Sequence, residues 1–124
     1  MPDYVDGWIG VDLDGTLAKY NQFEGELIIG EPVPKMVERV KEWLRLGKEV
    51  RIFTARVYLE HENIHSARTV RVAQIKRTIE QWCAKHVGQV LPITYKKDFN
   101  MVELWDDRAV QVIPNTGIRV DKKS

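Results

Sequence analysis

The stretch Trp8-Ile9-Gly10-Val11-Asp12-Leu13-Asp14-Gly15-Thr16-Leu17 joins an apolar run to two carboxylates that stand one residue apart. The run at residues 8–11 predicts a buried strand that leads directly into Asp12. Side chains alternate along a strand, so Asp12 and Asp14 leave it on the same side, but the turn at Gly15 re-aims the second carboxylate. Two acids this close repel each other, and a bound divalent cation is the usual way to keep both ionised near neutral pH. The pair therefore favours a metal site.

Two other interpretations of this stretch fit less well. A calcium loop of the EF-hand kind needs glycine at its sixth position and glutamate at its twelfth, whereas counting from Asp12 the glycine is fourth and the twelfth residue is Phe23. A solvated surface turn would explain Asp and Gly, but it would not explain the apolar run before them.

Length and composition indicate one globular domain over residues 1–124, with a polar tail at 121–124. The chain has 44% hydrophobic and 30% charged residues, which is typical of a globular protein. Its net charge is +1, so its overall charge does not attract it to nucleic acid or to a membrane surface. The single cysteine, Cys83, excludes an internal disulfide and favours a reducing compartment. The chain opens with no basic and apolar leader, and no apolar run is long enough to cross a bilayer. We expect a cytoplasmic protein that has no membrane partner.

Strand and helix patterns alternate along the chain. Apolar spacing of three and four predicts helices over residues 34–47 and 66–86, and a small hairpin is expected near 23–27. Besides the first strand, the sequence predicts strands at residues 50–54, 91–95, 101–105 and 110–113. This alternation predicts the α/β class: a three-layer α/β/α Rossmann-like sandwich with a mostly parallel sheet covered on both faces.

Polar residues follow several of the predicted strands. Thr54 ends the second strand, and Asp106, Asp107 and Arg108 follow the run at residues 102–105. The carboxyl ends of parallel strands meet at one edge of a sheet, which is where sites form in such folds. We therefore expect these groups to lie near Asp12, where their oxygens suit a hard cation such as Mg²⁺.

Four segments, VDLDGTL, VRIFTAR, YKKDF and VELWDDRAV, resemble the four ordered motifs of the haloacid dehalogenase (HAD) superfamily of phosphotransferases. The match extends from Trp8 to Val112, and four motifs in order are far more specific than one. The resemblance implies a phosphatase in which Asp12 is the nucleophile and Asp14 the general acid and base. It also implies that Thr54 and Lys97 hold phosphate oxygens.

The same resemblance implies a Mg²⁺ site, which Asp106 and Asp107 complete together with Asp12 and Asp14. It leaves open which of the two later acids binds the metal directly. Members of the family often carry Lys-Pro in the third motif, whereas here Lys96 and Lys97 are adjacent and Asp98 follows. We favour Lys97 as the phosphate ligand, with Lys96 as the alternative.

A competing motif lies at residues 61–65. The sequence His61-Glu62-Asn63-Ile64-His65 matches HExxH, which on a helix places two imidazoles on one face for zinc and uses the glutamate as a general base. Arg71 stands where one class of such enzymes needs a third histidine. A zinc-dependent hydrolase is therefore an alternative to the Mg²⁺ phosphatase, and a catalytically silent HAD-like binding module is another.

The spacing between the motifs bears on the substrate. HAD enzymes commonly insert a cap domain after the first motif or between the second and third, but residues 18–31 and 56–95 are too short for one. An open site suits a bulky phosphorylated substrate, and the capless plan and DDR motif resemble the phosphatase half of polynucleotide end-processing enzymes. We expect a nucleotide or nucleic-acid end phosphate as substrate, contacted by Arg56, Arg68 and Arg71. The sequence gives no sign of an oligomer.

Overall fold

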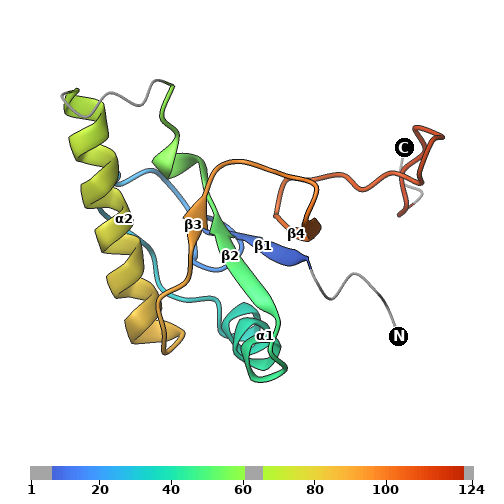
Figure 1. The fold of residues 1–124 in the computed structure, drawn as a ribbon, viewed down its shortest axis with the longest axis horizontal. Helices are drawn as coiled ribbons and strands as arrows, with labels where there is room; N and C mark the ends of the chain where they lie inside the picture. Colours follow the sequence, from blue (N-terminus) through green and yellow to red (C-terminus); the bar gives the residue numbers. More distant parts are fainter. Residues whose placement is uncertain (1–6, 61–65, 122–124) are drawn as a thin grey trace.

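The computed structural model describes residues 7–60 and 66–121, which form an α/β fold (Figure 1). In chain order its elements are β1 (Trp8–Asp12), α1 (Pro34–Arg45), β2 (Glu49–Phe53), the short 3₁₀ helix η2 (Ala55–Val57), α2 (Ala67–His86), β3 (Ile93–Thr94) and β4 (Met101–Trp105). The four strands pair in parallel in the order β3-β2-β1-β4. The predicted α/β class and parallel sheet are confirmed, and the described residues contain no cap domain.

Local signals explain where the two long helices begin and end. Proline occupies the first turn of α1, where its missing N–H costs no hydrogen bond, and Gly47 adopts a φ of 79° just beyond its last turn. Ser66 precedes α2, and its Oγ accepts a hydrogen bond from the Thr69 N–H at 3.0 Å. Both helices lie where the apolar spacing predicts them.

The hydrophobic core lies on one face of the sheet. The inward side chains of β1 and β2 pack in a single cluster with side chains of both α1 and α2, including Ile9, Val11, Ile52, Val40 and Ile75. The crossovers from β1 to β2 and from β2 to β3 move along the sheet in the same direction, so a right-handed path puts both helices on the same face. Burial of these apolar side chains is the main stabilising contribution to the fold.

The opposite face of the sheet carries no helix in the described residues. Trp8 is 1% exposed there, stacked with Phe53 at 6.4 Å between ring centroids and covered by the Arg51 guanidinium at 4.4 Å. The connection from β3 to β4 passes this face without forming a helix, and the Asp98 carboxylate accepts a hydrogen bond from the Trp8 indole at 2.9 Å. Of the three layers expected from the sequence, the described residues thus supply the sheet and one helical layer.

Two local predictions differ from the structure. Residues 110–113 do not join the sheet, because the chain turns back on itself: the Ile113 N–H donates to the Ile118 carbonyl, and Asn115 in the turn has a φ of 69°. This C-terminal segment extends away from the sheet (Figure 1). The expected hairpin at 23–27 is also absent; a longer loop over residues 19–31 is closed by the Lys19 N–H, which donates to the Glu31 carbonyl.

No helix in the described part of the chain is long and apolar enough to cross a membrane.

Candidate active site

Three carboxylates converge at the carboxyl edge of the sheet. Asp12 is the last residue of β1, and Asp106 and Asp107 directly follow β4, the neighbouring strand. One oxygen of each carboxylate lies within 4.8 Å of the others. We call Asp12, Asp106 and Asp107 the carboxylate cluster. Oxygen donors at this spacing fit a hard divalent cation such as Mg²⁺.

The electrostatics of the cluster also fit a cation. The pKa of Asp12 is raised from 3.8 to about 7, first by burial, then by the nearby charge of Asp106 and by a hydrogen bond with Asp107. The Thr16 hydroxyl donates to Asp12 at 3.3 Å, which acts in the opposite direction. Without a positive charge, the cluster therefore holds a proton that free aspartates would release.

The turn after β1 requires glycine for two reasons. Gly15 has a φ of 90°, and a Cβ at this position would stand 2.4 Å from Oδ2 of Asp107. Leu13 and Leu17 on either side are fully buried, which fixes the turn to the core. The sequence Leu-Asp-Gly-Thr-Leu thus lets the backbone approach the β4 carboxylates closely while its two leucines hold the turn in place.

Asp14 has a different partner from Asp12. The Arg56 guanidinium, from η2, donates two hydrogen bonds to its carboxylate, at 2.8 and 2.9 Å. The Asp14 side chain is not one of the three in the carboxylate cluster, so its predicted role as a metal ligand through the side chain gains no support from the geometry. The two acids of the motif therefore have different surroundings: Asp12 belongs to the carboxylate cluster, and Asp14 is held by an arginine.

Thr54 lies at the end of β2 and is 2% exposed. Its hydroxyl oxygen accepts a hydrogen bond from the Arg56 backbone N–H at 3.1 Å, so it caps η2, and its hydroxyl proton remains available to an acceptor in the site. The register places Asp12 opposite Phe53, the residue before Thr54. The predicted meeting of these strand ends is therefore present in the structure.

A single pocket of about 360 Å³ collects most of the predicted site. Its lining includes five acid and hydroxyl residues expected from the sequence, namely Asp12, Asp14, Thr54, Asp106 and Asp107. Two cations, Arg56 and Arg108, line the same pocket, together with Tyr20 and Phe23 from the loop at 19–31. Sequence reasoning did not assign a role to Tyr20 or Phe23, because no local pattern shows that this loop returns to the strand ends.

The predicted phosphate lysine is not brought to this pocket. Lys97 is exposed and is not among the residues that line the pocket, and the Lys96 ammonium lies 5.5 Å from the centre of the Tyr95 ring. Positive charge in the pocket comes from the two arginines instead. The choice between the lysines stays a prediction.

Arg68 and Arg71 have partners within the chain. Arg68 donates to the Glu26 carboxylate at 2.7 Å and to the carbonyls of Arg56 and Tyr58, and Arg71 donates to Glu26 at 3.3 Å. Together with Arg56, they tie the loop at 19–31 to η2 and α2. We call Arg56, Arg68 and Arg71 with Glu26 the arginine anchor; of the three expected substrate contacts, Arg56 alone lines the pocket beside the carboxylate cluster. The HExxH motif at 61–65 lies outside the described residues.

The chain resembles one solved structure in its fold. This is the conserved protein coded by a locus from Bacteroides thetaiotaomicron, with a TM-score of 0.55, 20% sequence identity and coverage of 88% of this chain and 82% of that one. No protein-family model matches the sequence, and no curated protein matches it significantly. At this identity the likeness supports the α/β fold, and the function has to be argued from the site.

Proposed function

We propose that this protein is a Mg²⁺-dependent phosphomonoester hydrolase of the HAD type that works without a cap domain. The observation that carries the proposal is the convergence of the carboxylate cluster beside a separately held Asp14 and the buried Thr54. Phosphoryl transfer needs an in-line nucleophile, a proton donor and neutralisation of the charge that spreads over the phosphate oxygens. The residues that line the pocket can supply each of these.

The carboxylate cluster would hold the cation through Asp12, Asp106 and Asp107. Bound there, Mg²⁺ would neutralise charge on the phosphate and allow an anionic nucleophile to approach it. It would also favour the deprotonated form of Asp12, whose pKa is raised to about 7 in the metal-free protein.

The proposed reaction has two steps. In the first, an Asp12 oxygen bonds to phosphorus while the bond to the leaving alcohol breaks, and Asp14 gives its proton to the alcohol oxygen. In the second, water attacks the aspartyl-phosphate and Asp14 accepts a proton from it, which releases phosphate and restores Asp12. Arg56 fixes the position of Asp14, and the Thr54 hydroxyl can donate to a phosphate oxygen.

The test is hydrolysis of 4-nitrophenyl phosphate with and without Mg²⁺. We expect Mg²⁺-dependent turnover in the wild type and no measurable turnover in Asp12→Asn, because an amide is neither an anionic nucleophile nor a good ligand for a hard metal. Asp14→Asn should slow turnover by about a hundredfold or more and keep the fold, since proton transfer is lost rather than packing. Glu38→Gln, an exposed acid-to-amide change on α1, is the matched control.

Three outcomes would contradict the proposal. Full activity in Asp12→Asn would exclude it as the nucleophile, and wild-type rates in Asp14→Asn at all pH values would exclude proton transfer by that residue. A wild-type protein that folds, binds Mg²⁺ and yet hydrolyses no phosphomonoester would favour the silent binding module.

The remaining expectations about the cell biology belong to this proposal. A cytoplasmic location agrees with Cys83, which is free and buried, with a pKa that burial raises to about 12, so this thiol has little of the thiolate character of a reactive cysteine. A nucleic-acid end as substrate has less support than the chemistry, because all three arginines expected to contact it bond within the chain and only Arg56 lines the pocket.

A further inference from the structure

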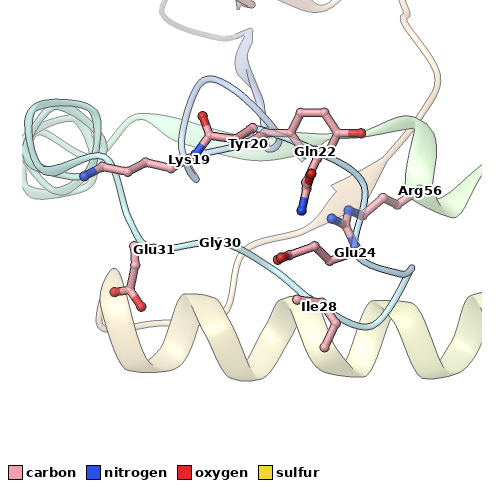
Figure 2. Close-up of a pocket in the computed structure, with 9 residues that line it drawn as sticks. Lys19, Tyr20, Gln22, Glu24, Ile28, Gly30, Glu31 and Arg56 are labelled. Carbon is pink, nitrogen blue, oxygen red and sulfur yellow. The ribbon is translucent and has the colours of Figure 1, made fainter.

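A second cavity adjoins the pocket of the carboxylate cluster. It has a volume of about 290 Å³, is bordered by the loop at 19–31 and is partly open to solvent (Figure 2). Tyr20 and Arg56 line both this cavity and the carboxylate pocket, so the two spaces share a wall. We call it the loop cavity. A group attached to a phosphate in the first pocket would therefore meet the loop cavity next.

The loop cavity presents polar groups that have no partner of their own. The Tyr20 hydroxyl, the Gln22 amide and the Glu24 carboxylate make no side-chain hydrogen bond within the described residues. Figure 2 shows the side chains of Gln22, Glu24 and Arg56 directed toward the space between the two runs of the loop. Donors and acceptors gathered in this way suit a ligand that has several hydroxyl groups, each of which both donates and accepts.

The frame of the cavity is held at several points, which makes it a preformed space. The loop is closed at its base, where the Lys19 N–H donates to the Glu31 carbonyl at 2.8 Å. Gly30 lies so close to this closure that a Cβ would stand 2.1 Å from the Lys19 carbonyl oxygen, and its own carbonyl accepts from the Trp82 indole at 3.0 Å. At the far end Arg56 donates to the Glu26 carbonyl at 2.8 Å.

The charge and size of the cavity decide between classes of substrate. Its four charged side chains balance, with two cations and two anions: Lys19, Arg56, Glu24 and Glu31. A balanced lining does not favour a polyanion such as an oligonucleotide, whose binding depends on a surplus of Lys and Arg. A volume near the lower limit for ligand pockets suits a compound of sugar size rather than a polymer end.

We propose that the loop cavity binds the alcohol part of the substrate, and that this alcohol is a small polyhydroxylated compound, as in sugar and polyol phosphates. The inference rests on the proposed phosphatase activity, because it places the phosphate of that reaction in the carboxylate pocket. Glu24 and Gln22 act as specificity determinants: they bond to hydroxyl groups of the leaving alcohol and take no part in the attack on phosphorus.

The experiment compares kcat/KM across four kinds of phosphomonoester: sugar and polyol phosphates, 4-nitrophenyl phosphate, a nucleoside monophosphate and a 5′-phosphorylated oligonucleotide. We expect at least one sugar or polyol phosphate to exceed 4-nitrophenyl phosphate by about tenfold or more, as bonds to hydroxyl groups of the alcohol add to the binding of the transition state. In Gln22→Ala and in Glu24→Gln, the ratio of these two kcat/KM values should fall by about tenfold, since the first loses its hydrogen bonds to the alcohol and the second replaces a charged acceptor by a weaker neutral one.

Glu38→Gln again serves as the control and should leave that ratio unchanged. A ratio that neither cavity variant alters, or a preference for the nucleotide or the oligonucleotide, would overturn this inference while the phosphatase proposal stands. An absence of Mg²⁺-dependent hydrolysis of 4-nitrophenyl phosphate in the wild type would overturn both.

Discussion

The carboxylate cluster and the arginine anchor lie near the same site, but they differ in how their negative charges are compensated. In the cluster three carboxylates converge, and within the described residues none of them has an ion-pair partner. The anchor has one carboxylate, that of Glu26, and it pairs with the guanidinium groups of Arg68 and Arg71. The pKa values follow, because burial raises the pKa of Asp12 whereas the hydrogen bond from Arg68 lowers the pKa of Glu26.

This difference separates the carboxylates that would bind a cation in the proposed function from the ion pairs that hold the loop in place. A carboxylate with a guanidinium partner is already stabilised, and its removal costs stability. A carboxylate packed against other carboxylates costs stability until a cation joins it, and such an arrangement is typical of functional sites. The packing of the helices and strands therefore does not account for the convergence of these three carboxylates.

Apart from the changes to Asp12 and Asp14 themselves, the largest effect should come from filling the space between the β1 turn and the cluster. Gly15→Ala would place a Cβ 2.4 Å from the Asp107 carboxylate, in a backbone conformation with a φ of 90°. We expect Mg²⁺-dependent hydrolysis of 4-nitrophenyl phosphate to fall by about a hundredfold or more, the effect of misplacing a catalytic group by about 1 Å. Initial rates at saturating Mg²⁺ measure this.

Gly88→Ala is the matched control for that variant. Gly88 has a similar φ of 99°, and nothing lies within 4 Å of its Cβ position. Both variants should lose stability through backbone strain, by about 1 kcal/mol, but only Gly15→Ala should lose activity beyond its loss of folded protein. Equal activity in the two variants would show that Asp107 is not needed where the structure places it.

A second prediction uses the raised pKa of Asp12 in the metal-free protein. Unfolding returns this carboxyl to its ordinary pKa of 3.8, so between 3.8 and about 7 the folded state binds more protons than the unfolded state. In EDTA this group should therefore make the free energy of unfolding fall as pH rises through that window. Mg²⁺ should reverse the loss most strongly near pH 7 and above, where no proton has to be displaced.

Denaturant unfolding at a series of pH values, with EDTA or with Mg²⁺, tests this. Asp12→Asn cannot titrate and should lack the part of the pH dependence that distinguishes the wild type. If Mg²⁺ stabilised the wild type equally at pH 4.5 and pH 8, the cluster would not be the binding site.

The arginine anchor should give a smaller effect, and one on stability. Glu26→Gln removes the charge that Arg68 and Arg71 share, and we expect a loss of about 0.5–1 kcal/mol, as for partly exposed ion pairs. Because the pKa of Glu26 is lowered from 4.5, the stability it contributes is present above that value and disappears as pH falls below it. The difference between wild type and variant in urea unfolding should shrink accordingly, and a difference that grew at low pH would contradict the pairing.

Much of the fold and the core of the site could be predicted from local patterns. The apolar run before Asp12 indicated a buried strand, and the periodic apolar residues of α1 and α2 fixed their extent. Once the strands are parallel, their carboxyl ends have to meet, which brings Thr54, Asp106 and Asp107 to Asp12. These predictions rest on backbone geometry, which local sequence determines well.

The partners of individual side chains could not be predicted in the same way. Nothing in the spacing of Arg56 and Asp14, 42 residues apart, shows that they pair, or that Arg68 bonds to Glu26 rather than to a substrate. The loop at 19–31 has no regular periodicity, and its closure depends on a backbone contact at Gly30 that only the folded chain reveals. Residues 110–113 look like a strand, but the turn at Asn115 lets the chain pair with itself instead.

The smallest effect is expected from the HExxH motif. Replacement of both His61 and His65 by alanine should leave Mg²⁺-dependent hydrolysis of 4-nitrophenyl phosphate within about tenfold of wild type, because neither imidazole is needed to hold Mg²⁺ or to attack phosphorus in the proposed mechanism. The purified wild-type protein should contain no stoichiometric zinc by elemental analysis. One tightly bound Zn²⁺ per chain, lost in the double variant together with the activity, would instead assign the reaction to a zinc hydrolase. Zinc that was lost without any change in hydrolysis would separate a structural metal from the chemistry and leave the carboxylate cluster as the catalytic centre.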